Sequence, residues 1–199
     1  MGRTFTESGR RAQIVQAAIE VVAELGYAKA SFSRIAKQAG LSSTGMISYH
    51  FAGKDDLMHE VVAEVTRVTA AFMTPRIGAA EGGRARLRAF IESNVELLAV
   101  CPRHLKALIE VLPNLGGDDP ANVGYQDSMR VAMELQEQAV RAAQEAGEFR
   151  EFDPRLMLVA LRGAIDAVVM RWVGDPTFDV TEAGRELADT FDRATRAEP

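Results

Sequence analysis

The chain has 199 residues, a net charge of −5 and 47% hydrophobic residues, enough to bury one sizeable core or a small head on a larger body. Its apolar stretches are too short to cross a bilayer, and the N-terminus has no signal-peptide pattern, so we expect a cytoplasmic protein with no membrane partner. A single cysteine, Cys101, fits a reducing compartment; it is either a redox sensor or a small buried hydrophobic residue.

Charge is divided unevenly along the chain. Residues 1–54 carry seven Lys or Arg and three Asp or Glu, a net charge of +4, and the remaining 16 basic and 25 acidic residues give −9. A basic head on an acidic body is typical of a DNA-binding module carried by a domain with another task. The first 54 residues therefore predict a head with double-stranded DNA as its partner.

Three short helices are predicted in this head. The first runs from Arg11 to Leu25, with apolar residues at helical spacing on one face. Ser31 is placed to cap a second helix, which ends where Gly40 allows a positive φ. Ser42 or Ser43 is a natural cap for a third helix, which exposes small polar and aromatic side chains. The spacing predicts a helix-turn-helix, either an ordinary corner of an all-α protein or a motif whose second helix enters the major groove.

The sequence motifs of this head resemble those of the TetR family of bacterial transcriptional regulators. The resemblance rests on the run 39–42, Ala-Gly-Leu-Ser, and on residues 47–57, Ile-Ser-Tyr-His-Phe-Ala-Gly-Lys-Asp-Asp-Leu. It implies a ligand-responsive repressor that binds a palindromic operator as a homodimer, without a cofactor. The interval between the two runs is one residue longer than in the family's commonest form, which leaves the register of the recognition helix open.

Side-chain chemistry and the resemblance together indicate the DNA contacts. Small residues let a helix approach base edges, a tyrosine suits a thymine methyl or a phosphate oxygen, and a lysine at a helix start suits phosphate. His50 either donates to phosphate or packs at the helix end beside Phe51, which we expect in the core. The predicted DNA-binding residues are Ser33, Arg34, Ser43, Thr44, Gly45, Ser48, Tyr49, His50 and Lys54.

The body is predicted to be helical throughout. Breaker and capping residues place helices from Lys54 to about Met73 (before Pro75), 84–100, 104–111, Asn122 to 146, 154–174 and 179–196, with a loop at 112–120. We therefore expect an all-α protein with a helix-turn-helix domain over residues 1–54 and a ligand-binding and dimerisation domain over residues 55–199.

The last two helices carry strips of small or apolar residues. Paired with a two-fold copy they would form a four-helix bundle, as the resemblance also implies; the alternative is packing within one subunit. The predicted interface residues are Ala160, Gly163, Ala164, Ala167, Val180, Ala183, Leu187 and Phe191.

The remaining body helices are predicted to enclose a cavity for a small, largely apolar effector, although a filled core is the simpler reading of each position. The predicted lining is Phe72, Phe90, Leu97, Leu108, Met129, Met133, Leu161 and Ile165, with Asn94, His104, Tyr125 and Gln126 as polar anchors.

Enzymatic chemistry finds little support. The histidines form no metal-spaced cluster with cysteine, and the chain lacks a nucleophile motif and a phosphate-binding glycine loop. His59 and Asp55, four residues apart, are more simply read as a solvated helix pair than as metal ligands. The hypotheses are a DNA-binding regulator, a small-molecule-binding helical protein whose head has another role, and an enzyme of unrecognised type.

Overall fold

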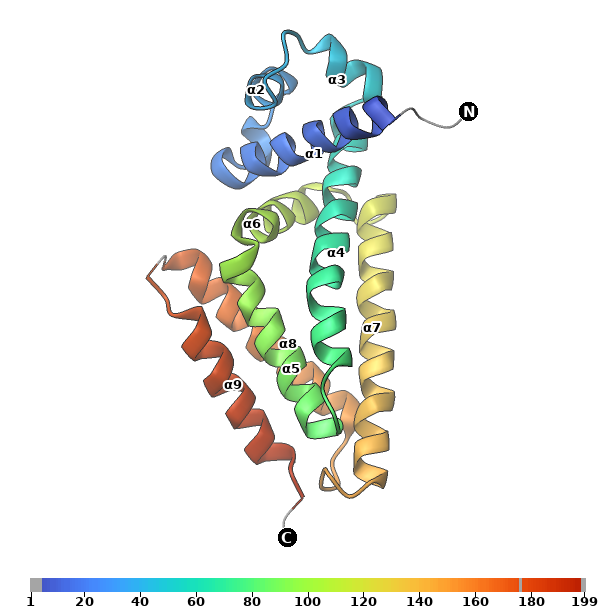
Figure 1. Cartoon of the computed structure of the whole chain (residues 1–199), viewed down its shortest axis with the longest axis vertical. Coiled ribbons are helices and arrows are strands. Elements are labelled where there is room, and N and C mark those ends of the chain that lie inside the picture. Colours follow the sequence, from blue (N-terminus) through green and yellow to red (C-terminus); the bar gives the residue numbers. More distant parts are fainter. Residues whose placement is uncertain (1–4, 176, 198–199) are drawn as a thin grey trace. The chain divides into compact units, whose positions relative to one another are not determined.

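The computed structural model describes residues 5–175 and 177–197. Over these residues the chain forms α-helices, two 3₁₀ turns and no β-strand, which confirms the predicted all-α class (Figure 1). The elements are α1 (Phe5–Leu25), η1 (Tyr27–Lys29), α2 (Phe32–Gln38), α3 (Gly45–His50), α4 (Lys54–Gly78), α5 (Gly83–Val100), α6 (Pro102–Val111), η2 (Leu112–Asn114), α7 (Pro120–Glu145), α8 (Pro154–Gly174) and α9 (Val180–Thr195).

Contacts divide the chain into two compact units. The head unit joins the chain up to Val68 with Pro102–Gln126, and the body unit joins Thr69–Cys101 with the chain from Asp127 onward. The sequence placed its boundary after residue 54, whereas the head unit also contains the first part of α4 and all of α6. Helix α6 was expected in the body but packs along α1 (Figure 1).

The core of the head forms because α1, α2 and α3 each bury one apolar face. Ile14, Ile35 and Ile47, one from each helix, are fully buried, and Phe51 fills the space after α3 as expected. Ser31 caps α2 by accepting a hydrogen bond from the Arg34 N–H, and α2 is followed by Gly40 at φ 65°. Both local signals in the sequence are thus confirmed.

Several helix boundaries in the structure differ from those predicted from the sequence. Helix α4 continues through Pro75 to Gly78 and does not stop before the proline. The Ser42 and Ser43 side chains do not cap α3, whose N-cap is Thr44 without a side-chain hydrogen bond. Asp119, not Asn122, caps α7, because its carboxylate accepts a hydrogen bond of 2.9 Å from the Ala121 N–H.

Asp119 also contacts His59, whose Nε2 lies 2.9 Å from the second carboxylate oxygen. The hydrogen bond from His59 lowers the pKa of Asp119, so this carboxylate is ionised at neutral pH. His59 thus joins α4 to the start of α7, and it does so through Asp119 instead of Asp55.

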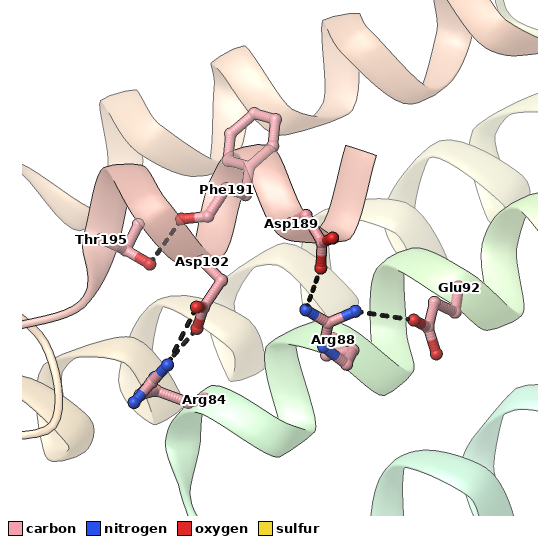
Figure 2. A network of polar contacts seen from close by, with 7 residues as sticks. All are labelled: Arg84, Arg88, Glu92, Asp189, Phe191, Asp192 and Thr195. Carbon is pink, nitrogen blue, oxygen red and sulfur yellow. Dashed lines mark hydrogen bonds and ion pairs between the residues drawn. The ribbon is translucent and has the colours of Figure 1, made fainter. Parts of the chain in front are cut away.

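In the body unit, α9 lies alongside α5 (Figure 1). Gly184 of α9 allows close approach, since a Cβ there would lie 3.4 Å from the Cβ of Val95. Charged pairs flank this apolar contact: Arg84 makes two 2.9 Å hydrogen bonds to Asp192, and Arg88 joins Asp189 to Glu92 (Figure 2). These pairs fix the register of α9 on α5.

Candidate functional site

The exposed face of α3 is the first candidate site. Gly45 and Ser48 are exposed, as expected for a helix that approaches base edges, and Tyr49 keeps 71% of its surface exposed. Met46, at 43% exposure, joins this face although it was not among the predicted DNA contacts. Its position three residues before Tyr49 was the signal that it lies beside the predicted contacts. Helix α3 begins at Gly45, and which of its residues contact bases stays a prediction.

Helix α1 holds the other two helices of the motif at their C-terminal ends. Arg11 Nη1 donates to the His50 carbonyl at 2.7 Å, and Gln13 Nε2 donates to the Ala39 carbonyl at 2.7 Å. The last carbonyls of a helix have no partner inside the helix, so these side chains satisfy groups that would otherwise need water. Arg11 also pairs with Glu60 of α4 at 2.6 Å and stacks on the Phe51 ring, its guanidinium carbon 4.2 Å from the centroid.

Sequence reasoning missed Arg11 and Gln13. Their spacing shows only that they lie on the polar side of α1, and the carbonyl groups they reach are 39 and 26 residues away in the chain. No local pattern reveals such contacts.

Lys54 has a different environment from the one expected. Its ammonium donates to the Tyr27 carbonyl at 2.7 Å and lies 3.8 Å from the Tyr27 ring centroid, and burial lowers the pKa of the amine. Lys54 is therefore engaged with the turn after α1, and its contact with phosphate stays a prediction. Asp56 accepts a hydrogen bond from the Ala52 N–H, so its negative charge is used at the start of α4.

The other predicted DNA contacts are divided between solvent and structural roles. Ser33, Ser43 and Thr44 are exposed. Arg34 is exposed as well, but its Nη1 donates to the Lys29 carbonyl at 2.9 Å. His50 is half-buried, and its ring meets that of Tyr49 edge-on at 5.0 Å. Arg3, part of the basic head, lies outside the described residues.

A pocket of about 220 Å³ in the body unit is the second candidate site. Buried apolar residues of α5, α7 and α8 form its floor, among them Leu87, Val140 and Leu158, together with Phe149 of the α7–α8 connection. Its polar lining consists of Arg86, Gln136 and Glu148. Among the twelve predicted ligand-binding residues, only Phe90 lines this pocket.

Comparison with known proteins identifies the fold of the head. Residues 14–61 match the family model described as bacterial regulatory proteins, tetR family, and this segment contains α2, α3 and most of α1. The head of the chain, residues 14–61, belongs to the TetR family. The head geometry and the family model agree on the same residues, which confirms the resemblance seen in the sequence.

Sequence similarity to known regulators extends beyond the head. The HTH-type transcriptional regulator BetI 1 of Chromohalobacter salexigens is 36% identical over 88 residues, 44% of this chain and 43% of that protein. The chain thus spans less than half the length of this relative. The fatty acid metabolism regulator protein of Bacillus subtilis is 28% identical over 179 residues, 89% of this chain and 91% of that protein.

A solved structure agrees over nearly the whole chain. The FadR transcriptional regulator of Bacillus subtilis in complex with stearoyl-CoA superposes with a TM-score of 0.75 at 24% identity, covering 90% of this chain and 96% of that one. This likeness shows that the chain shares the helical fold of that regulator.

The predicted ligand-binding set is divided between the two units of the chain. Leu108 is buried in the core of the head unit, and Tyr125 packs against the same core. His104 and Gln126 also belong to the head unit.

The other eight predicted ligand-binding residues belong to the body unit. Leu161 and Ile165 are buried in its core, and Phe90 and Met133 pack against it. The Asn94 amide donates to the Phe90 carbonyl of its own helix. A buried position and an inward-facing ligand contact have the same helical spacing, so the sequence could not separate core from pocket. Phe72, Leu97 and Met129 complete the set.

His104 offers a direct test of electrostatics in the head unit. Burial lowers its pKa, although the carboxylates of Glu64 and Glu20 favour its protonated form and Arg67 opposes it. The folded state therefore binds fewer protons than the unfolded state below the ordinary histidine pKa of about 6.5, so His104 reduces stability as the pH falls through that value.

When the pH is lowered from 7.5 to 5.5, we expect the free energy of unfolding of His104→Gln to rise relative to that of the wild type. Urea unfolding at the two pH values measures this difference, and the variant comparison cancels the other titrating groups. A difference that is the same at both pH values would contradict the assignment.

The predicted dimer residues separate into two groups. On α8, Ala160, Gly163 and Ala167 are exposed, and the same face carries Leu156 and Met170 with 67% and 64% of their surfaces exposed. On α9, Val180 is buried, and Leu187 and Phe191 pack against the core of their own unit. Ala164 of α8 and Ala183 of α9 are half-buried. The interface stays a prediction, with its open apolar face on α8.

The described residues were also inspected for a membrane-spanning helix, a metal-binding group and a reactive cysteine. Over the described residues no helix is long and apolar enough to span a membrane, and no group of three or more His, Cys, Asp or Glu side chains could hold a metal ion. Cys101 is half-buried after α5, and burial raises the pKa of its thiol, which disfavours the reactive thiolate.

Proposed function

We propose that the protein is a homodimeric DNA-binding transcriptional regulator, a repressor that leaves a palindromic operator when a small, largely apolar molecule binds its C-terminal helices. The observation that carries the proposal is the exposed face of α3, where Gly45, Ser48 and Tyr49 are open to solvent while Ile47 anchors the helix in the core. Such a helix can lie in the major groove without disturbing its own packing.

A dimer is supported by the uncovered apolar face of α8 and by the energetics of recognition. One short helix contacts few base pairs, and two copies related by a two-fold axis read two half-sites about one helical turn apart. The effector is supported by the apolar pocket of the body unit and by the stearoyl-CoA in the FadR structure, whose acyl chain is apolar.

Control of DNA binding follows from linkage. A ligand in the body cannot touch bases, so it acts by favouring one arrangement of the two heads over another. Helix α4 starts at Lys54, directly after the recognition helix, and contributes Ile77 to the pocket of the body unit. We infer that α4 carries the change, so that effector and operator weaken each other's binding by the same factor.

The experiment that tests this function is binding of the purified protein to the DNA upstream of its own gene. We expect protection of two symmetric half-sites and an affinity that falls steeply as salt rises, because neutralised phosphates release counterions. A protein that binds small molecules but shows no preference for any DNA sequence would support the alternative, a helical small-molecule-binding protein without operator recognition.

Tyr49 separates base reading from phosphate contact. We expect Tyr49→Ala to cost about 1–3 kcal/mol on the operator and to relax preference at one position of each half-site. Tyr49→Phe keeps the ring and should retain most of the preference if the ring contacts a thymine methyl. Fluorescence anisotropy on operators with single base changes measures both effects, and an unaltered preference in Tyr49→Ala would exclude this role.

A further inference from the structure

The pocket of the body unit has features that point to one class of ligand. Its volume of about 220 Å³ is smaller than the roughly 300–1,000 Å³ of sites for drug-sized ligands, so it suits a short chain and not a large ring system. The floor is buried and apolar, whereas Ala139 and Ala142 on α7 are exposed and keep the entrance open.

The pocket exists because the ends of α5 and α7 approach each other closely. A Cβ on Gly83 would lie 2.3 Å from the Cβ of Ala143, so only the Ala143 methyl group separates the two helices at this point. Alanines at 139 and 142 then leave space beside the contact that larger side chains would fill. The opening is thus built from the small residues of α7.

The polar groups of the lining differ in what they already bind. Glu148 accepts hydrogen bonds from the N–H groups of Gly83 and Arg84, which lower its pKa, so it is ionised and engaged as the cap of α5. Arg86 Nε donates to the Ala80 carbonyl at 3.1 Å, and its positive charge helps to lower the pKa of Glu148, but its guanidinium makes no close ion pair among the described residues. The Gln136 amide likewise has no hydrogen-bond partner in the described part of the chain.

We propose that this pocket binds a monocarboxylate with a short unbranched apolar chain, its carboxylate on Arg86 and its chain on the floor formed by Leu87, Val140 and Phe149. A guanidinium presents paired donors that match a carboxylate. Gln136 supplies a further donor from α7. Binding of the ligand's apolar chain removes apolar surface of both the ligand and the pocket from water. This inference rests on the proposed function, since it identifies the effector site of the same protein.

Direct binding tests the site without DNA. Isothermal titration calorimetry with sodium octanoate is expected to show saturable binding to the wild type and at least a tenfold loss of affinity in Ala139→Leu, whose side chain occupies the pocket. Gln138→Leu is the matched control, because Gln138 is the adjacent exposed residue of α7 and does not line the pocket. Equal binding by the two leucine variants, or no binding by the wild type, would overturn the proposal.

The carboxylate is tested with a neutral probe of the same length. Arg86→Gln is expected to weaken octanoate binding about fivefold, the effect of an exposed ion pair, and to leave 1-octanol binding unchanged. An equal loss for both probes would overturn the role of Arg86.

Operator release by octanoate is measured separately on wild-type protein. If Ala139→Leu loses octanoate binding but octanoate does not release the wild type from the operator, the pocket is a binding site and its role as the effector site is rejected. If octanoate still releases Ala139→Leu from the operator, the protein is a regulator but this pocket is not its effector site.

Discussion

Arg11→Ala is expected to destabilise the head by about 2–3 kcal/mol and to weaken operator binding more than binding to unrelated DNA. The side chain is only 13% exposed and makes three contacts that no neighbour can replace: with the His50 carbonyl, with Glu60 and with the Phe51 ring. A hydrogen bond from a charged donor contributes about 1.5–3 kcal/mol, and the ring contact adds about 0.5–1 kcal/mol. Loss of the bond to His50 frees the end of α3, the helix that must fit the groove.

The adjacent arginine provides a matched control. Arg10→Ala removes the same charge from the same helix, but among the described residues Arg10 donates only to Gln13, its neighbour on α1. We expect Arg10→Ala to leave the unfolding free energy within about 0.5 kcal/mol of the wild type and to weaken all DNA binding to a similar extent. Urea unfolding and anisotropy titrations with operator and random duplexes provide the comparison.

A lysine at position 11 separates charge from geometry. Arg11→Lys keeps the charge but lacks the planar fork that contacts a carbonyl, a carboxylate and a ring together. We expect it to remain destabilised and to recover the non-specific part of DNA binding only. If Arg11→Lys behaves as the wild type, Arg11 acts through its charge and does not position α3.

The features that the sequence predicted well are local. Ser31 and Gly40 act within one turn of the helix ends that they determine, so a hydroxyl or a missing Cβ is enough to place the boundary. Fold class followed from the same signals repeated along the chain. Pro75 misled the prediction because the helix continues through it, despite the hydrogen bond that a proline cannot donate.

The features that the sequence did not predict depend on contacts between distant segments. Apolar spacing on the helix 104–111 was correct, but it could not show that Leu108 packs into the head and not beside a ligand. Glu148 looks like an ordinary acidic residue after α7, yet its carboxylate caps α5, which begins 65 positions earlier in the chain. Helix periodicity gives the direction a side chain faces, and the identity of the facing element is a property of the tertiary structure.

Dimer formation gives the largest expected effect of a single substitution. Ala167→Glu places a charge in the middle of the exposed apolar face of α8, where a two-fold axis would bring two such charges into one interface. A buried unpaired charge costs about 2–5 kcal/mol, so the pair is expected to raise the dimer dissociation constant by at least about a thousandfold. The same glutamate is compatible with the helix, because Ala167 is exposed in the protomer and glutamate is a good helix former.

Sedimentation equilibrium and operator titration of this variant connect assembly to recognition. We expect a folded monomer with an operator affinity at least about a hundredfold weaker, since each head then reads one half-site alone. Gln138→Glu introduces the same charge at an exposed position of α7 and is expected to remain dimeric. Substitution of Leu187 or Phe191 is a poorer test, because both pack against the core of their own unit and a charge there unfolds the protomer. A dimeric Ala167→Glu that still binds the operator would therefore place the interface on a face other than that of α8.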